Sequence, residues 1–244
     1  MQNDTQYKDR IAEAQLAAES WSPQRILSWA FDTFGNKVAI ASAFGSEGMV
    51  LIDMAVGVRK DFRLFTMDTE FLFPETHTLM ERIEQKYEVK IERILPLLSP
   101  AETEQAHGAA LWSRDPDQCC NLRKVEPLRR KLKELAAWIT SIRRDQTLFR
   151  KSAGKVEWGE KFGLVKINPI ADWTSKQVWR YLFEHGVPYN SLYDRNYSSI
   201  GCTHCTRAVL PGEDPRSGRW PGLAKTECGL HIIEPLKPLP EAEA

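Results

Sequence analysis

The chain has 244 residues, and 42% of them are hydrophobic, including eight Trp and ten Phe, which is enough to build the core of one large α/β domain. Its 33 basic and 33 acidic side chains leave a net charge of zero, which argues against a general binder of nucleic acid or membrane surfaces but allows a local basic site. The polar start MQNDTQYKDR has no signal-peptide pattern, and no stretch approaches the roughly 18 apolar residues of a membrane span, so we expect a soluble, cytoplasmic protein without a nucleic-acid or membrane partner.

The predicted elements alternate between helix and strand. A helical pattern at 7–31 is divided by Ser22 and Pro23, because a cap residue before Pro marks a helix start. Residues 143–161 read as a charged loop, and the chain from Gly186 onward reads as mostly irregular. Apolar runs typical of strands fall at 38–43, 62–67, 89–95, 138–142 and 164–167, and further helical patterns fall at 49–58, 74–87, 122–136 and 174–185.

This alternation predicts an α/β fold with a mostly parallel, twisted sheet, helices on both faces and an irregular C-terminal segment packed over it. We expect a single domain over 1–244, with an N-terminal helical extension at 1–20 and a mobile tail at 221–244 that carries Cys228. Ligands of such sheets gather at the carboxyl ends of the strands, so residues that follow strands are candidates for a site.

The stretch VAIASAFGSEGMVLID (38–53) predicts a strand, a Gly-containing loop and a helix start. Amides and the helix dipole at that start favour an anion, and Ser42 and Ser46 add hydroxyl donors. The loop is neither a Walker A sequence nor a dinucleotide fingerprint, and an ordinary strand-to-helix turn explains it equally well. Asp68 follows the next strand, where it can bind a ribose hydroxyl or an adenine amine, or cap the next helix. The two elements together favour a nucleotide pocket.

Arginines follow a later strand and recur near the C-terminus. Guanidinium groups bind phosphate or sulfate oxygens through paired hydrogen bonds, although such a run also fits a solvated loop. The residues concerned are Arg143, Arg144 and Arg150 in the first group and Arg216 and Arg219 in the second.

Four of the five cysteines stand in two pairs, Cys119-Cys120 and Cys202-x-x-Cys205. In a reducing compartment such cysteines favour metal binding or catalysis over disulfides. Adjacent side chains diverge and strain a single zinc ion, whereas they can bind two irons of one cluster, so the spacing favours 4Fe–4S over zinc. The adjacent pair can also be two small buried residues. Lys124 follows closely and can offset the charge of a thiolate-bound cluster.

Cys228, in KTECGLH, has no partner in either pair. A lone cysteine of an intracellular enzyme is a candidate nucleophile, and an incidental surface thiol is the alternative. Lys225 and His231 are close enough in sequence to favour the thiolate, while Glu227 opposes it.

Taken together, these motifs resemble those of the assimilatory sulfonucleotide reductases, in particular the iron–sulfur adenylyl-sulfate (APS) reductases. The resemblance covers about residues 20–235 and implies an adenine nucleotide alpha hydrolase-like (PP-loop) fold. It rests on AFGSEGMVLID, MDTEFLFPET, CCNLRKVEPL, WITSIRRDQ, PIADWTSKQVW, PYNSLYDRNYSSIGCTHCTRAV, EDPRSGRW and KTECGLH.

The resemblance implies that Cys228 attacks the sulfur of APS, that AMP leaves, and that thioredoxin or a glutaredoxin-like dithiol releases sulfite from the S-sulfocysteine. It implies Lys124 and His231 as further catalytic residues, and a 4Fe–4S cluster on Cys119, Cys120, Cys202 and Cys205 that is not thought to shuttle electrons. The implied substrate-binding residues are Ser42, Phe44, Gly45, Ser46, Glu47, Asp68, Thr69, Arg143, Arg144, Arg216 and Arg219. Homo-oligomerisation is left open.

The chain departs from the family pattern at Ala43, Glu70, Phe71 and Ser141, positions that we expect to touch the nucleotide pocket. The four paired cysteines favour APS over its 3′-phosphorylated form (PAPS), with PAPS or dual use as the alternative. An iron–sulfur tRNA-thiolation enzyme would need an SGGxDS-type loop and a basic RNA surface. A zinc-stapled nucleotide-binding module would leave Cys228 without a role.

Overall fold

The computed structural model describes residues 11–223, 225 and 227–230. Residues 11–18 are helical, and the later helices are α2 (Pro23–Phe34), α3 (Ser46–Val58), α4 (Pro74–Tyr87), α5 (Pro100–His107), α6 (Leu111–Arg114), α7 (Pro116–Cys120), α8 (Glu126–Leu132) and α9 (Ser175–Glu184). The strands are β1 (Val38–Ala41), β2 (Arg63–Met67), β3 (Ile91–Ile94), β4 (Ala137–Ile139), β5 (Val156–Gly159) and β6 (Leu164–Ile167).

The strands form one sheet in the order β3-β2-β1-β4-β6-β5. Every neighbouring pair is parallel except β5 and β6, which confirms the predicted mostly parallel sheet. The edge strand β5 lies inside the predicted charged loop 143–161, so that prediction was wrong for its last part. The charged residues around this four-residue strand mask its sequence pattern. The chain leaves β5 through a tight turn, in which Gly163 has a φ of +67°, and pairs with it again as β6.

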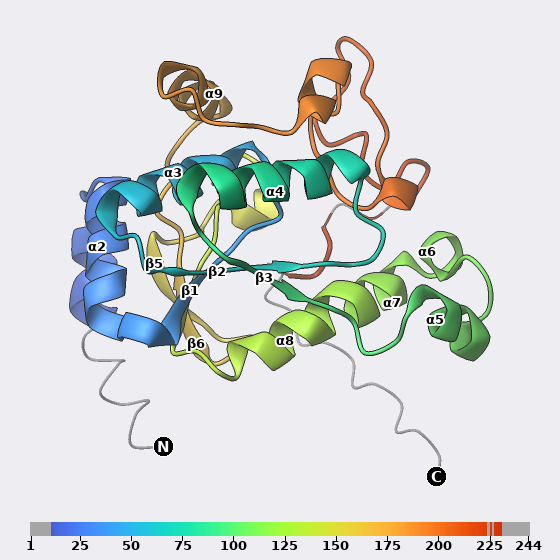
Figure 1. The fold of residues 1–244 in the computed structure, drawn as a ribbon, viewed down its shortest axis with the longest axis horizontal. Helices are drawn as coiled ribbons and strands as arrows, with labels where there is room; N and C mark the ends of the chain where they lie inside the picture. The colour runs from blue at the N-terminus through green and yellow to red at the C-terminus, as the bar shows by residue number, and fades with distance from the viewer. Residues whose placement is uncertain (1–10, 224, 226, 231–244) are drawn as a thin grey trace.

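Helices cover both faces of the sheet, as Figure 1 shows. Successive strand residues face opposite sides, so Ile40 and Leu64 join one core while Ala39 and Phe65 join another. The first core is completed by α2, α3, α4 and α9, and the second by Leu128 and Leu132 of α8 together with Trp138. Ile11, Ala14 and Ala18 are buried in the first core as well, so the described part of the N-terminal extension belongs to the domain.

The helix starts follow the capping signals in the sequence. Ser22 accepts a hydrogen bond from the Arg25 amide ahead of Pro23, and Thr174 forms a capping box with Gln177 at the start of α9. The predicted helix 122–136 was wrong in its bounds. Helical backbone already begins at Pro116, passes through a π-helical turn, η2 (Asn121–Val125), and ends at Leu132.

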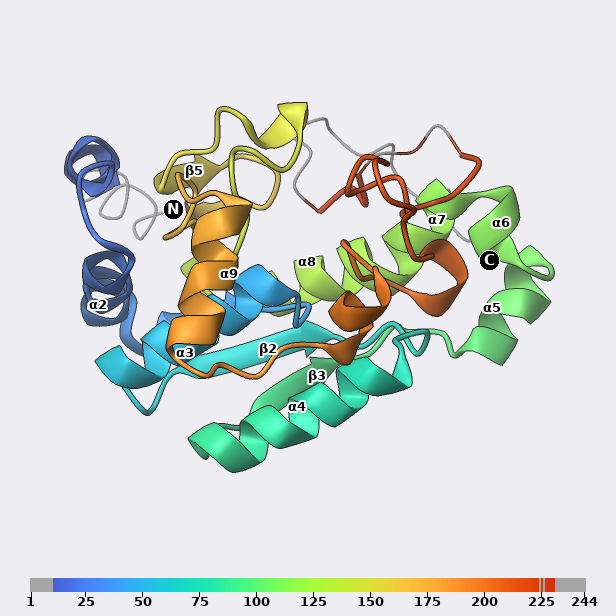
Figure 2. The ribbon, with the colours of Figure 1, turned by 90° about the horizontal axis from the view of Figure 1, so that it is seen from above.

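From Gly186 onward the described chain is mostly irregular, as predicted, with short 3₁₀ turns at η4 (Ser191–Arg195) and η5 (Thr203–Cys205). Figure 2 shows this segment, orange to red, gathered near α6 and α7 at one end of the sheet. Isolated bridges join Leu72 to Cys202 and Thr206 to Arg219, and so tie the segment to the β2–α4 connection and to itself. No helix within the described ranges is long and apolar enough to cross a membrane.

Candidate active site

A cavity of about 730 Å³ lies where the carboxyl ends of β1, β2 and β4 meet the C-terminal segment. Its walls come from the predicted anion loop, from the residues after β2 and β4, and from the irregular segment after α9. Among the lining residues are Ala43, Gly45, Ser46, Glu47, Thr69, Lys124, Ser141, Arg143, Arg150, Tyr193, Arg216, Arg219, Trp220 and Cys228.

The anion loop is held in shape by its own buried groups. Ser42 Oγ accepts a hydrogen bond from the Phe44 amide at 3.0 Å, and Phe44 has a φ of 55°. Both residues are 1% exposed and neither lines the cavity, and their contacts shape the loop. The amide of Ser46, at the helix start, donates to Tyr193 Oη at 2.9 Å.

Of the two polar residues after β2, only the second faces the cavity. Asp68 Oδ1 accepts from the Glu70 amide at 3.0 Å, so its carboxylate serves the turn, and the residue does not line the cavity. Thr69 lines the cavity, and its Oγ1 lies 3.3 Å from Cys202 Sγ. Thr69 therefore joins the end of β2 to the paired cysteines.

The departures from the family pattern fall in two places. Ala43 and Ser141 line the large cavity, as expected. Phe71 instead lines the smaller cavity of the paired cysteines, and Glu70 forms an ion pair with Arg123 at 3.2 Å. The expectation that all four positions touch one nucleotide pocket is therefore corrected for Glu70 and Phe71.

The first group of arginines does not act as one unit. Arg143 lines the cavity and forms ion pairs with Glu47 and with Asp145. Arg144 is turned away from the cavity, because its guanidinium reaches Glu19 at 2.7 Å and the Ala153 carbonyl at 2.8 Å. The structure thus does not bring Arg144 to the other candidate ligands, and instead uses it to hold the N-terminal extension.

Three cations converge on the side of the cavity near Cys228. Burial lowers the pKa of Arg216, whereas burial of Lys124 is outweighed by the negative potential of Cys202, Cys120 and Cys228, which raises its pKa. Arg219 stacks on Trp220 at 4.6 Å, and its buried Nε has no hydrogen-bond partner within the described parts of the chain. Such a donor is suited to an anionic ligand.

Cys228 lines this cavity and is partly buried against Cys120, Cys205 and Trp220. The preceding Glu227 is buried and forms ion pairs with Arg150 at 2.8 Å and Arg216 at 3.6 Å. Burial raises the pKa of Glu227, but these arginines outweigh it and hold the pKa below its usual value. His231 lies outside the described residues.

The four paired cysteines line one smaller cavity beside the first, together with Lys124 and Arg123. All four are buried and free of disulfides. Burial, and after it the negative potential of the other three thiols of the set, together raise the pKa of Cys119 to about 12. Four converging thiols next to a cation form a donor set for an iron–sulfur cluster, because a metal displaces their protons.

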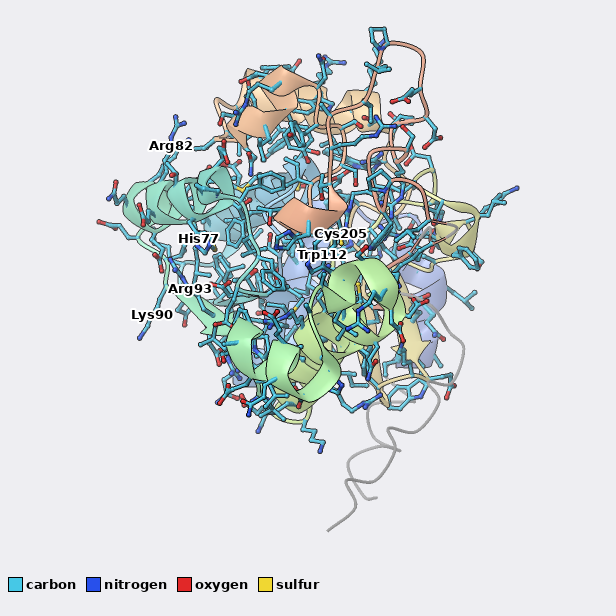
Figure 3. All side chains as sticks on the ribbon, turned by 90° about the vertical axis from the view of Figure 1, so that its right-hand side faces the viewer. His77, Arg82, Lys90, Arg93, Trp112 and Cys205 are labelled. Carbon is cyan, nitrogen blue, oxygen red and sulfur yellow. The ribbon has the colours of Figure 1, made fainter. Side chains whose placement is uncertain are left out.

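The four thiols match a metal centre in their number and chemistry. Within the described residues, no three His, Cys, Asp or Glu side chains are placed to bind a single metal ion. A tetrahedral zinc ion needs its sulfur ligands within about 4 Å of one another, whereas a 4Fe–4S cluster spreads them over different irons. Figure 3 shows Trp112 beside Cys205, where α6 meets the C-terminal segment, and Trp112 also stacks on His204 at 4.6 Å. His77, Arg82, Lys90 and Arg93 lie on the left side of that view, on α4 and around β3, away from the paired cysteines.

Sequence reasoning missed several residues of the large cavity. Trp179 and Tyr193 pack edge to face at 5.0 Å and form an aromatic wall. Trp220, which is 1% exposed, packs in one cluster with Cys120 and Cys205, and Cys228 lies against that cluster. The runs PYNSLYDR and RSGRW carry Tyr193 and Trp220, but aromatic residues there are equally typical of a core.

Comparisons with known proteins show which family the chain resembles. A family model described as "Phosphoadenosine phosphosulfate reductase domain" matches residues 37–208. The chain is 45% identical over 207 residues to an adenosine 5'-phosphosulfate reductase of Shouchella clausii, covering 84% of this chain and 86% of the relative. It is 47% identical over 216 residues to a phosphoadenosine 5'-phosphosulfate reductase of Gloeobacter violaceus, covering 87% and 90%.

Solved structures match as well. The crystal structure of a phosphoadenylyl-sulfate (PAPS) reductase from Candida auris in complex with phosphate has a TM-score of 0.72 and 34% identity, and the match covers 82% of this chain and 97% of that one. An FMN adenylyltransferase of Candida glabrata matches with a TM-score of 0.57 at 12% identity over 84% of this chain and 71% of that one. The second match shows only a shared α/β fold.

Proposed function

Since the chain belongs to the phosphoadenosine phosphosulfate reductase domain family, we propose that it reduces adenosine 5'-phosphosulfate (APS) to sulfite and AMP in sulfate assimilation. One observation carries the proposal: Cys228 lines the same cavity as the start of α3 and the cations Lys124, Arg216 and Arg219. A nucleophilic thiol, an anion-binding helix start and positively charged donors are what the reduction of a sulfonucleotide requires.

The attack of a thiolate on a sulfonucleotide brings two negative charges together, so the charges that line the cavity affect its rate. APS is a mixed anhydride of sulfate and AMP, so a thiolate that approaches its sulfur meets negative charge. Arg219, with its buried unpartnered Nε, is suited to bind a sulfonate oxygen, and Lys124 and Arg216 add positive charge nearby. Fixed cations in a partly closed cavity stabilise the transition state without reorganising at the moment of reaction.

In the first step Cys228 Sγ forms a bond to the sulfate sulfur, and the bond between that sulfur and the bridging oxygen breaks. The electron pair leaves with AMP, and an S-sulfocysteine remains. A thiolate of a dithiol reductant of the thioredoxin or glutaredoxin type then attacks Cys228 Sγ, and sulfite leaves with an electron pair. The second thiol of the reductant resolves the mixed disulfide, restores the Cys228 thiol and leaves the reductant oxidised.

The four paired cysteines would hold a 4Fe–4S cluster, since their donor set fits one. When bound, the cluster supplies a compact charged centre next to the substrate cavity. Lys124 lines both cavities and can therefore balance charge on both sides. Purified protein with a brown colour and broad visible absorbance supports the cluster, while colourless protein with stoichiometric zinc refutes it.

The nucleophile is tested by incubation with APS in the absence of a reductant, followed by peptide mass spectrometry. We expect one sulfite-sized adduct on Cys228, and no sulfite formation by Cys228→Ser protein that retains its iron. An adduct on another cysteine would contradict the scheme.

PAPS is the second candidate substrate, because the Gloeobacter violaceus relative bears that name. Turnover of the two nucleotides under identical conditions separates the alternatives. We place this reaction in the cytoplasm, where a dithiol reductant keeps the cysteines reduced.

A further inference from the structure

The segment that carries Cys228 is held to the domain by one buried carboxylate. The Glu227 side chain is 1% exposed. Arg150 donates from Nε to Oε1 at 2.9 Å and from Nη2 to Oε2 at 2.8 Å, and Thr147 Oγ1 donates to Oε1 at 3.0 Å. Both oxygens are therefore bound by a paired, charge-assisted contact from the 3₁₀ turn η3 (Leu148–Arg150) and the residue before it.

The other contacts of this segment are an uncharged acceptor, an apolar contact and an ion pair with an exposed carboxylate. Lys161 donates to the Gly229 carbonyl, Leu230 packs on the second core, and Lys225 reaches Asp117 at the exposed side of α7. Among the described residues of this segment, only Glu227 forms a contact that is buried and charged on both partners, since the Arg150 side chain is 10% exposed. The residue that follows Glu227 is Cys228, so this contact fixes the position of the thiol along the chain.

We propose that Glu227 is a positioning residue, whose buried pair with Arg150 docks the segment so that Cys228 faces the substrate cavity. The inference rests on the proposed function of Cys228 as the nucleophile. Removing Glu227 leaves the Arg150 guanidinium buried without a carboxylate partner, and removing Arg150 leaves Glu227 with only the longer contact to Arg216 at 3.6 Å, so either change disfavours the docked arrangement. Cys228 then spends most of its time away from the sulfur that it attacks, although the nucleotide site itself is intact.

Arg150 also lines the cavity, so a direct contact between Arg150 and the substrate is the rival explanation. The two explanations differ in how the variants combine. If Arg150 acts through Glu227, Glu227→Gln, Arg150→Gln and the double variant lose similar amounts of activity. If Arg150 binds the substrate independently, the losses multiply and nucleotide affinity falls with Arg150→Gln.

The experiment uses the iron-loaded full chain and three measurements. The rate of tryptic cleavage after Lys225 measures how firmly the segment is docked. The rate of adduct formation on Cys228 in a single turnover with APS measures the chemical step. The dissociation constant of AMP measures whether the nucleotide site is intact. We expect Glu227→Gln to raise cleavage about tenfold and to slow adduct formation about 10- to 100-fold, with AMP affinity within about twofold of wild type.

The matched control is Asp172→Asn. It removes a carboxylate from a buried lysine, Lys155, outside both the cavity and the tail, and should leave all three measurements unchanged. Adduct formation at the wild-type rate in Glu227→Gln, or multiplicative losses in the double variant, would overturn the proposal.

A milder variant covers the case in which Glu227→Gln does not fold. Thr147→Val removes one hydrogen bond and leaves the ion pair, so we expect cleavage after Lys225 to rise about threefold; unchanged cleavage would then overturn the proposal. If wild-type protein forms no adduct with APS, the proposed function fails, whereas the cleavage comparison still decides whether Glu227 docks the tail.

Discussion

Gly48 lies in the first turn of α3, and its hydrogen in place of a side chain leaves room for the anion loop. A Cβ at this position would come within 3.0 Å of Ser42 Oγ, which real Cβ atoms essentially never do. Ser42 is buried and its Oγ holds the Phe44 amide, so Gly48→Ala must displace both. Overpacking costs about 1–3 kcal/mol, the lost hydrogen bond about 1 kcal/mol, and the helix preference of Ala returns about 1 kcal/mol.

We therefore expect Gly48→Ala to lower the free energy of unfolding by about 1–3 kcal/mol, which for a chain of this size lowers Tm by about 2–10 °C. AMP affinity should fall about tenfold, because a small displacement of the loop misplaces its amides. Differential scanning calorimetry and titration with AMP measure the two effects.

Gly57→Ala is the internal control, since it lies in the same helix with no atom within 4 Å of its Cβ position. It should stabilise the protein by up to about 1 kcal/mol and leave AMP binding unchanged. If Gly48→Ala melts as high as Gly57→Ala and binds AMP like wild type, the loop is not constrained in the way inferred from its contacts.

Gly201→Ala should displace the Arg219 guanidinium, whose Cζ lies 2.6 Å from the Cβ position, and lower kcat/KM for APS about tenfold while iron content stays constant. Cys205→Ser should lower the iron content measured by elemental analysis, whereas Cys228→Ser should not. Because the folded-state pKa of Glu227 is depressed, its contribution to stability is present above the ordinary glutamate pKa and is lost as pH falls through the lower value. The difference in unfolding free energy between wild type and Glu227→Gln should accordingly be constant near neutral pH and shrink in acid, and a pH-independent difference would refute the assignment.

The sheet could be predicted because its strands are short apolar runs separated by helical patterns, and buried parallel strands have that signature. The edge strand β5 has no such run, since only Val156 is buried among partly exposed neighbours. The π turn within the helix that carries Cys119 and Cys120 also leaves no sequence signal, because it depends on packing at both ends.

The site was predicted at the level of segments rather than side chains. Arg143 and Arg144 are sequence neighbours, yet one lines the cavity and the other binds Glu19, because successive side chains of non-helical backbone point in different directions. Asp68 was placed correctly at the end of a strand, but its carboxylate is taken by its own turn. The pairing of Glu227 with Arg150 joins residues 77 positions apart, which one sequence cannot reveal.

The π turn at Asn121–Val125 also limits how this region tolerates insertions and deletions. The π turn is a wider helical turn that connects α7 to α8. Helix α7 carries Cys119 and Cys120, and α8 packs on the sheet through Leu128 and Leu132. Each residue of a helix adds about 100° of rotation, so removing one residue here would turn the two cysteines away from Cys202 and Cys205 or turn α8 away from its core. The number of residues between Cys120 and Leu128 is therefore as much a requirement of the site as the cysteines themselves, and a gap in that segment of a relative would mark the loss of the four-thiol site.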